Sequence, residues 1–352
     1  MRKKISVLLC LALVLLSASG CKAQPELKKY QATFLTLFDS VTLVSGYEPD
    51  KETFTQSAQL IHDKLEVYHR LYDIYGSYEG INNLKTVNDN AGISPVAVDQ
   101  RIIDLLTFAM EMYEKSGGTV NIAMGSVLKL WHDARTYGVE NPEEAYLPDA
   151  AALAEAARHT DIHSMIIDSA AGMVYLADPD MRLDVGAIAK GYAVEAVSRE
   201  LAAEGFDHYA VSAGGNIRTI GPRADGSGWL VGVDNPEEKN ESDKYLLMLS
   251  VADMAVVTSG SDQRYYTVDG VRYHHIIAPD TLYPKNLYRS VTVVSPDSAL
   301  ADALSTALFN MDRQAGQSLL ESLEGTEAMW VDSAGGITYS TGFEQYISDR
   351  KG

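Results

Sequence analysis

Apolar residues recur along the chain with two different periods. From residue 53 to residue 72 they return every three or four positions, which predicts an amphipathic helix with Leu60, Ile61 and Leu65 on one face. A second helix is predicted to begin at Asp99, whose side chain can cap it, and to run to about residue 115. Further helices are expected over residues 149–159, 190–203, 299–309 and 312–323.

Shorter apolar runs with a period of two or of one predict strands. The clearest hairpin joins residues 265–268 to residues 271–277, because Asp269-Gly270 between them is typical of a type I′ turn. The polar segment after Tyr72 is rich in asparagine and is either a connector or a lid over a ligand. Other strands are expected over residues 34–44, 165–167, 174–176, 209–212, 217–220, 229–233, 245–251, 255–258 and 291–294, with a last hairpin over residues 329–339.

The order of these elements predicts an α+β fold. Helices come early and late, strands gather between them, and many strands are joined by hairpins, whereas a doubly wound sheet would alternate strands and helices. No Gly-x-Gly-x-x-Gly follows a strand, which argues against a Rossmann nucleotide site. We expect one domain over residues 34–345, preceded by a polar tether over residues 21–33.

The N-terminus has the pattern of a processing signal. Three basic residues precede an apolar run over residues 5–16, which is too short to span a bilayer. Ala18-Ser19-Gly20-Cys21 is similar to a lipobox, so we expect residues 1–20 to be a lipoprotein signal peptide and Cys21 to carry the lipid. The alternative is a plain secretory signal. A lipid-anchored protein on the extracytoplasmic face of the cell membrane is therefore expected.

Charge and cysteine content exclude several classes of function. The formal net charge of −19 becomes −22 when the three cations Arg2, Lys3 and Lys4 are removed, which argues against nucleic acid as a partner and against electrostatic docking on anionic lipid. Cys10 lies within the signal peptide, so the processed chain keeps only Cys21. It can form neither an intramolecular disulfide nor a thiolate metal site.

The stretch over residues 183–193 reads as a strand end, a turn of small residues and the start of a helix. A helix N-terminus favours a phosphate group, and Lys190 adds a full positive charge there, with Asp184 as an acceptor. Taken alone, the stretch favours an ordinary strand-to-helix corner that carries a surface lysine over a phosphate site.

Two oxygen-bearing side chains, Asp302 and Thr306, lie four residues apart on one predicted helix and therefore face the same way. A carboxylate and a hydroxyl in this arrangement can share a hard cation such as Mg²⁺, with backbone carbonyls completing the shell. Alternatively, Thr306 bonds to its own helix and Asp302 is a favourable charge near the helix start.

A pair of histidines ends the strongest predicted hairpin. Along a strand His274 and His275 point to opposite faces, so at most one of them faces a given site. Their neighbourhood lacks further ligands at zinc spacing, and a general base or a structural histidine is favoured over a zinc ligand.

Five stretches, taken in chain order, are similar to motifs of the ApbE family, the FAD:protein FMN transferases. The similarity runs from about residue 38 to residue 308 and implies a single α+β domain with a mixed, largely antiparallel sheet flanked by helices. The matching stretches are residues 184–191, Gly214-Gly215-Asn216, Thr258-Ser259-Gly260, residues 275–279 and the run Asp302-Ala303-Leu304-Ser305-Thr306-Ala307.

The resemblance implies roles for particular residues. Asp302 and Thr306 would bind Mg²⁺, helped by backbone oxygens of Ala187 and Ser305, and Asp302 would also count among the catalytic residues. His275 matches the family's catalytic histidine and would also contact FAD. The other residues that would hold FAD are Phe38, Tyr75, Thr119, Val120, Asn121, Asp184 and Lys190.

The chain departs from the family pattern at a few positions around this site. Asn121 stands where the family usually has aspartate, Ala123 replaces threonine, and Phe38 replaces methionine. After His275, Ala278 replaces an aspartate and Leu282 a glycine. None of these changes touches the implied metal ligands.

The activity that the resemblance implies is Mg²⁺-dependent transfer of the FMN part of FAD to a Ser/Thr hydroxyl of a partner protein, with release of AMP. The family's acceptor motif is roughly aspartate-glycine-x-serine/threonine-glycine-alanine-threonine, and this chain lacks it. Acceptors would be subunits of redox pumps or extracellular electron-transfer proteins. The alternatives are hydrolysis of FAD to FMN and AMP, or a flavin-binding lipoprotein without turnover.

Overall fold

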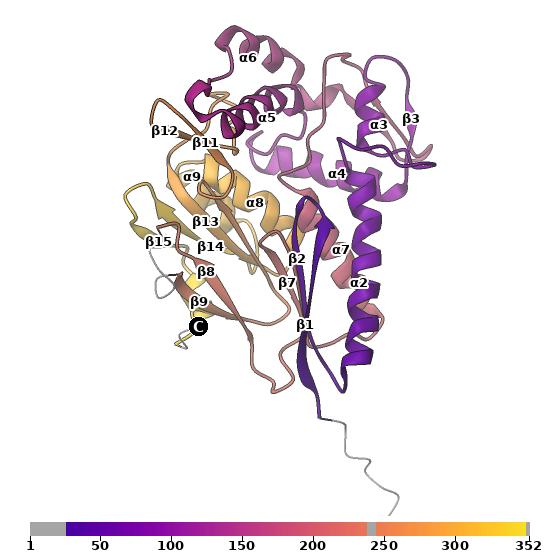
Figure 1. Cartoon of the computed structure of the whole chain (residues 1–352), viewed down its shortest axis with the longest axis vertical. Coiled ribbons are helices and arrows are strands. Elements are labelled where there is room, and N and C mark those ends of the chain that lie inside the picture. The colour runs from indigo at the N-terminus through magenta and orange to yellow at the C-terminus, as the bar shows by residue number, and fades with distance from the viewer. Residues whose placement is uncertain (1–25, 238–243, 350–352) are drawn as a thin grey trace, which may run out of the picture.

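The computed structural model describes residues 26–237 and 244–349 (Figure 1). The predicted signal peptide, the lipobox and Cys21 lie outside these residues, so the lipid anchor stays a prediction. Among the described helices, none combines the length and the apolar character that a membrane span requires.

An eight-stranded sheet forms the centre of the molecule, and every neighbouring pair of strands in it is antiparallel. The strands lie in this sheet in the same order as in the sequence, and the strands absent from it belong to smaller sheets. From one edge to the other, the strands are β1 (Lys28–Leu37), β2 (Ser40–Glu48), β6 (Tyr209–Ala213), β7 (Asn216–Ile220), β10 (Ala255–Gly260), β13 (Tyr288–Ser295), β14 (Glu327–Asp332) and β15 (Ile337–Tyr339).

The remaining described strands form three smaller antiparallel sheets. In the predicted hairpin, Asp269 and Gly270 have φ values of 52° and 79°, as a type I′ turn requires. The smaller sheets contain β3 (Val96–Ala97) with β5 (Met173–Leu176) and β4 (Met165–Asp168), β8 (Trp229–Asp234) with β9 (Tyr245–Val251), and β11 (Tyr265–Val268) with β12 (Val271–His274).

Helices cover the sheet and form a second group beyond one end of it (Figure 1). The helix α8 packs on β10 and β13, and α7 packs on β6, β7 and α8, while α2 covers β1 and β2. The described α-helices are α2 (Lys51–Tyr72), α3 (Leu84–Asp89), α4 (Gln100–Lys115), α5 (Gly125–Glu140), α6 (Ala150–Ala156), α7 (Ala189–Ala203), α8 (Ser298–Asn310) and α9 (Arg313–Glu321).

The main core lies between the sheet and these helices. Almost every side chain of α8 is buried, including polar Asp302 and Ser305, because the helix is covered by the sheet on one side and by α7 on the other. The predicted amphipathic helix over residues 53–72 is confirmed as α2, with Ile61 and Leu65 fully buried; Leu60, expected on the same face, is exposed.

Several predicted boundaries were wrong. The expected strand over residues 34–44 is a hairpin, in which Phe38 and Asp39 make the turn with φ values of 53° and 47°. Its first strand begins at Lys28, so residues 28–33 belong to the sheet and not to a tether. The strand expected over residues 271–277 ends at His274. The helices α3 and α5 were not predicted at all.

Candidate functional site

A cavity of about 1190 Å³ opens beside the first turn of α7, and segments from most of the chain form its walls. Of the predicted site residues inside the domain, all but one line it, although they are spread over more than two hundred positions of the sequence. The lining residues that sequence reasoning named are Phe38, Tyr75, Thr119, Val120, Asn121, Asp184, Ala187, Lys190, His275, Asp302 and Thr306.

Ser305 is the predicted residue that does not line the cavity. It is fully buried behind Asp302, and its hydroxyl lies 2.9 Å from the carbonyl oxygen of Asp302 and 2.7 Å from the hydroxyl of Ser259. The bond to Ser259 joins the second half of α8 to the end of β10. Ser305 therefore fixes the helix that carries Asp302.

The turn that precedes α7 is held in place by Asn88 of α3. The Asn88 side chain accepts a hydrogen bond from the Leu183 amide (2.7 Å) and donates one to the Leu183 carbonyl (3.0 Å). The next residue, Asp184, accepts a bond from the Gly186 amide at 2.8 Å, which shapes the turn. The asparagine-rich segment thus acts, at Asn88, as a structural connector to the site.

The start of α7 and the middle of α8 meet through a single hydrogen bond. The amide of Gly191 donates to Oδ2 of Asp302 at 2.7 Å, so one of the amides expected to face a phosphate is used by this carboxylate. A Cβ atom at position 191 would lie 2.3 Å from the Cβ of Asp302 and 2.4 Å from the carbonyl oxygen of Ser298. Only glycine permits this approach without displacement.

Asp302 is a buried carboxylate with few partners. Its side chain is 5% exposed, and this burial raises its pKa, against the opposing effects of Lys190, the Gly191 amide and Asn216. Thr306 lies one helical turn further on and lines the same cavity; within the described part of the chain its hydroxyl has no hydrogen-bond partner. A carboxylate and a free hydroxyl facing one space are hard oxygen donors that fit Mg²⁺.

The histidine pair separates as the strand geometry predicts. His274 is buried, its Nε2 lies 3.0 Å from the carbonyl oxygen of Lys285, and its ring packs edge-on against Phe309. His275 faces the cavity instead, with its Nδ1 3.2 Å from the carbonyl oxygen of Arg264. His274 is therefore a structural histidine, and His275 is available for chemistry.

The walls around His275 keep it neutral. His275 is exposed to the space of the cavity, and the protein atoms crowded around it, followed by the positive charges of Arg264 and Arg135, lower the pKa of His275 to about 3. A carbonyl oxygen can only accept a hydrogen bond, so the Nδ1 atom of His275 must be protonated and must donate to the carbonyl oxygen of Arg264. Nε2 is then left as a lone-pair acceptor.

Aromatic side chains form part of the rim. Tyr75 is 61% exposed, and its ring lies 5.7 Å from the ring of His132. Phe38 at the β1–β2 turn donates its backbone amide to Nδ1 of His69 at 3.2 Å. Both positions offer a ring surface of the kind that a planar heterocycle stacks on.

The side chain of Asn121, the position of one departure from the motifs, forms hydrogen bonds with nearby backbone groups of the cavity wall. Its side-chain amide donates to the carbonyl oxygen of Thr160 at 2.9 Å, and its oxygen accepts from the Ala123 amide at 2.9 Å. The side chain lines the cavity while both of its ends are engaged by backbone groups.

The cationic or titratable residues of the cavity that sequence reasoning missed include His132, Arg135 and Arg264. The first two belong to α5, which starts at Gly125 without a side-chain cap. A signal was available, because the buried Val127, Trp131 and Ala134 follow helical spacing.

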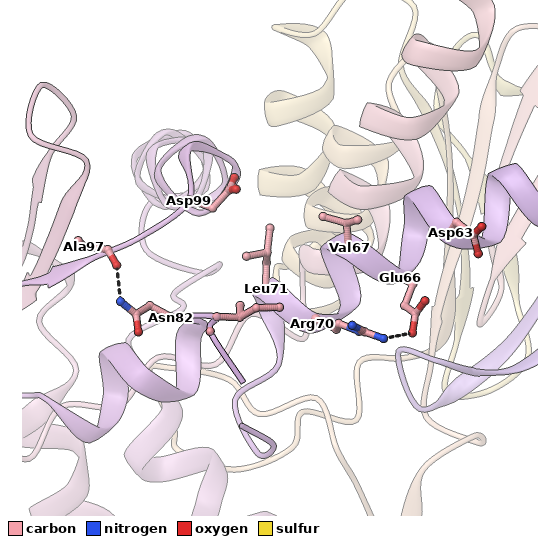
Figure 2. Close-up of a pocket in the computed structure, with 10 residues that line it drawn as sticks. Asp63, Glu66, Val67, Arg70, Leu71, Asn82, Ala97 and Asp99 are labelled. Carbon is pink, nitrogen blue, oxygen red and sulfur yellow. Dashed lines mark hydrogen bonds and ion pairs between the residues drawn. The ribbon is translucent and has the colours of Figure 1, made fainter. Parts of the chain in front are cut away.

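A second cavity of about 430 Å³ lies beside the C-terminal half of α2 (Figure 2). Polar groups on its wall satisfy one another: Arg70 pairs with Glu66 at 2.6 Å, and the side chain of Asn82 donates to the carbonyl oxygen of Ala97 at 2.8 Å. None of the predicted site residues lines it. The larger cavity is therefore the candidate active site.

Two clusters of potential metal ligands occur elsewhere in the described residues. One contains His62, Asp63 and Glu66, and the other contains His159, Asp178 and Asp180. In each cluster the histidine is within 3.0 Å of a carboxylate, so an ordinary ion pair accounts for the arrangement.

The amino-acid sequence was compared with those of known protein families. The model of the ApbE family matches residues 38–330. The chain belongs to the ApbE family. It is 32% identical to the FAD:protein FMN transferase of Treponema pallidum (strain Nichols) over 93% of this chain and 90% of that protein, and 30% identical to that of Klebsiella pneumoniae (strain 342) over 84% and 87%.

Solved ApbE structures share the fold. The ApbE protein from Thermotoga maritima superposes with a TM-score of 0.79 at 27% identity, covering 92% of this chain and 100% of that one. The flavin transferase ApbE from Vibrio cholerae gives 0.74 at 23% identity, covering 91% and 99%. The single α+β ApbE domain expected from the motifs is confirmed.

Proposed function

We propose that this ApbE-family chain is an Mg²⁺-dependent FAD:protein FMN transferase that moves the FMN part of FAD to a Ser/Thr hydroxyl of an acceptor protein and releases AMP. The observation that carries the proposal is the meeting of four side chains in one cavity. Two offer oxygen ligands, one a positive charge and one a neutral imidazole: Asp302, Thr306, Lys190 and His275. The two relatives described above are named FAD:protein FMN transferases, which supports the flavin-transfer part of the proposal.

The residues supply binding and charge neutralisation. Asp302 and Thr306 would hold Mg²⁺, helped by backbone oxygens of Ala187 and Ser305; when bound, this ion neutralises negative charge on the pyrophosphate of FAD. Lys190, in the first turn of α7, adds a positive charge for the same group. Together they reduce the repulsion that an anionic phosphate exerts on an attacking oxygen.

His275 would act as the general base. Its Nε2 accepts the proton of the acceptor hydroxyl, while its Nδ1 stays bonded to the Arg264 carbonyl. The hydroxyl oxygen then forms a bond to the phosphorus of FMN, and the bond from that phosphorus to the oxygen of AMP breaks. AMP leaves with the electron pair, and the chain forms no covalent intermediate of its own.

The remaining wall would bind the rings of FAD. Tyr75 and Phe38 offer aromatic surface at the rim, and Thr119, Val120 and Asn121 form the adjoining wall. Asp184, whose pKa is raised by burial, lies beside the turn before α7 and would accept a hydrogen bond from FAD. The domain would be anchored through Cys21 on the extracytoplasmic face of the membrane, where its acceptors would be redox-pump subunits or electron-transfer proteins.

The test uses the protein from Lys22 onward with FAD, Mg²⁺ and an acceptor domain that carries the family motif. Covalent flavin on the acceptor is followed by in-gel fluorescence and by mass. The expected result is an FMN-sized mass gain that disappears with Asp302→Ala and persists with Asp89→Ala, an exposed aspartate that pairs with Lys85. Release of FMN and AMP without labelling would favour the hydrolase, and FAD binding without turnover would favour the binding protein.

A further inference from the structure

Two arginines of the cavity lack the partners that arginines usually have. Arg135 of α5 donates to Nδ1 of His132 at 3.3 Å, and Arg264, between β10 and β11, reaches the carbonyl oxygen of Asp39 at 3.4 Å. Both line the cavity. Among residues 26–237 and 244–349, neither guanidinium forms an ion pair with a carboxylate. We refer to them as the arginine pair.

The missing partner is not explained by a shortage of acidic residues. The chain has 48 aspartates and glutamates against 29 lysines and arginines. Burial, followed by the charge of Arg264, lowers the pKa of Arg135, so the two cations repel one another in the free protein. An anion bound between them would offset this repulsion.

The chemistry of the arginine pair restricts the ligand to a carboxylate or a phosphate. The planar guanidinium group presents a fork of N–H donors that matches the two oxygens of either anion. The proposed function already assigns the pyrophosphate, the only anionic group of FAD, to Lys190 and to the Mg²⁺ that Asp302 and Thr306 would hold. The arginine pair is therefore left for the other substrate, the acceptor protein.

Arg264 contacts His275, the residue proposed as the general base. Its carbonyl oxygen accepts hydrogen bonds from the amide of His275 at 3.0 Å and from Nδ1 of the same residue at 3.2 Å. The charges of both arginines also act on this imidazole, so a group held by the arginine pair would lie close to the atom that would receive the proton. The acceptor hydroxyl must come to this imidazole.

We propose that Arg135 and Arg264 bind an acidic side chain of the acceptor protein, located within a few residues of the hydroxyl that receives FMN. This inference rests on the proposed transferase function. The arginine pair would select acceptors that carry a carboxylate next to the accepting hydroxyl, and would set the register of the acceptor segment at His275.

The test measures the two substrates separately. Arg135→Gln and Arg264→Gln are compared with Arg158→Gln, which removes an exposed arginine paired with Glu155 outside the cavity. Loss of a charged hydrogen bond should raise the KM for the acceptor domain by about ten-fold or more. The dissociation constant for FAD, from quenching of flavin fluorescence, should change by less than about two-fold. Arg158→Gln should leave both constants unchanged.

A second arm changes the acceptor. When the acidic residues beside the accepting hydroxyl become amides, wild-type protein should lose acceptor affinity to the same degree, and Arg264→Gln should then add little further loss. Arg264→Lys, which keeps the charge but not the fork, should recover part of the affinity. Circular dichroism establishes that each variant is folded.

The outcomes separate the two proposals. Weaker FAD binding with an unchanged acceptor KM would assign the arginine pair to FAD and overturn the inference, as would unchanged constants for both substrates. Labelling of the acceptor by wild-type protein in these cases leaves the transferase function standing. No labelling by wild-type protein would overturn both.

Discussion

The amide of Gly191 donates a hydrogen bond of 2.7 Å to the carboxylate of Asp302, and this bond joins the first turn of α7 to α8. The two residues are separated by 111 positions in the sequence. Their contact sets the distance between Lys190, next to Gly191, and the proposed metal ligands on α8. The geometry of the site thus depends on how closely two helices approach.

Replacement of Gly191 by alanine should damage both stability and activity. The added Cβ would meet Asp302 and the carbonyl oxygen of Ser298 at less than 3 Å, so α7 and α8 must move apart. Overpacking of this kind typically costs about 1–3 kcal/mol. Urea unfolding should show this loss, and acceptor labelling should fall with it, whereas Ala203→Ser on the exposed end of α7 should change neither. An unaltered midpoint for Gly191→Ala would contradict the close approach.

Mg²⁺ should stabilise the folded protein through Asp302. A ligand that binds only the folded state raises the melting temperature, and the amide of Asp302→Asn is a weaker cation ligand. Wild-type protein should therefore melt several degrees higher in millimolar Mg²⁺ than in EDTA, and Asp302→Asn should show almost no such difference. Asp89→Asn, on an exposed face of α3, serves as the matched control. An equal Mg²⁺ effect in all three proteins would place the ion elsewhere.

His275 should stay neutral well below the pH at which histidine usually titrates. Its pKa of about 3 lies below the ordinary value of 6.5, so the unfolded chain binds more protons than the folded one between these values. The contribution of His275 to stability is therefore present above about pH 6.5 and is lost as the pH falls towards 3.

NMR titration of the free protein tests whether the pKa of His275 is lowered. The pKa of His159 is raised by its hydrogen bond to Asp178, so the two rings should titrate on opposite sides of 6.5. His275→Gln should remove part of the acid-dependent loss of stability. A His275 signal that titrates near pH 6.5 would show that the arginine charges do not reach it.

The buried carboxylate of Glu195 should be important for stability. It accepts hydrogen bonds from Arg218 at 3.0 Å, from Arg199 at 2.7 Å and from the amide of Ser298 at 2.8 Å. Removing one member of a buried charged group costs about 3–5 kcal/mol, so Glu195→Ala should unfold at much lower denaturant concentration. Glu200→Ala, which breaks an exposed pair with Lys64, should cost less than about 1 kcal/mol. Equal losses would mean that burial does not strengthen the Glu195 contacts.

The elements that sequence periodicity predicted well are those with a strong apolar face or a specific turn. The helix α2 and the Asp269-Gly270 hairpin are examples, since a regular stripe and a left-handed dipeptide are local properties. The helix α5 was missed although its buried Val127, Trp131 and Ala134 follow helical spacing, because it starts at Gly125 without a side-chain cap and has Gly138 in its last turn. Its packing against β11 and α6 is a tertiary contact that the local pattern does not contain.

Most of the residues named from the motifs line one cavity, and the roles given to them stay predictions. Motifs named the residues that meet in the cavity, but they gave no account of why these residues meet. Asn88, which holds the segment before Asp184 from 95 residues away, carries no local signal of that role. The arginine pair was missed because the absence of a partner is a property of three-dimensional surroundings.

The walls of the cavity come from many separate segments, between Phe38 on the first hairpin and Thr306 on α8. No short stretch of the chain contains all of the residues that line the cavity, and loop closure over such distances makes the last contacts slow to form. Flavin quenching during refolding would therefore report the completed fold and not an intermediate. An unfinished chain would be unable to retain FAD, so loading of the substrate is coupled to the end of folding.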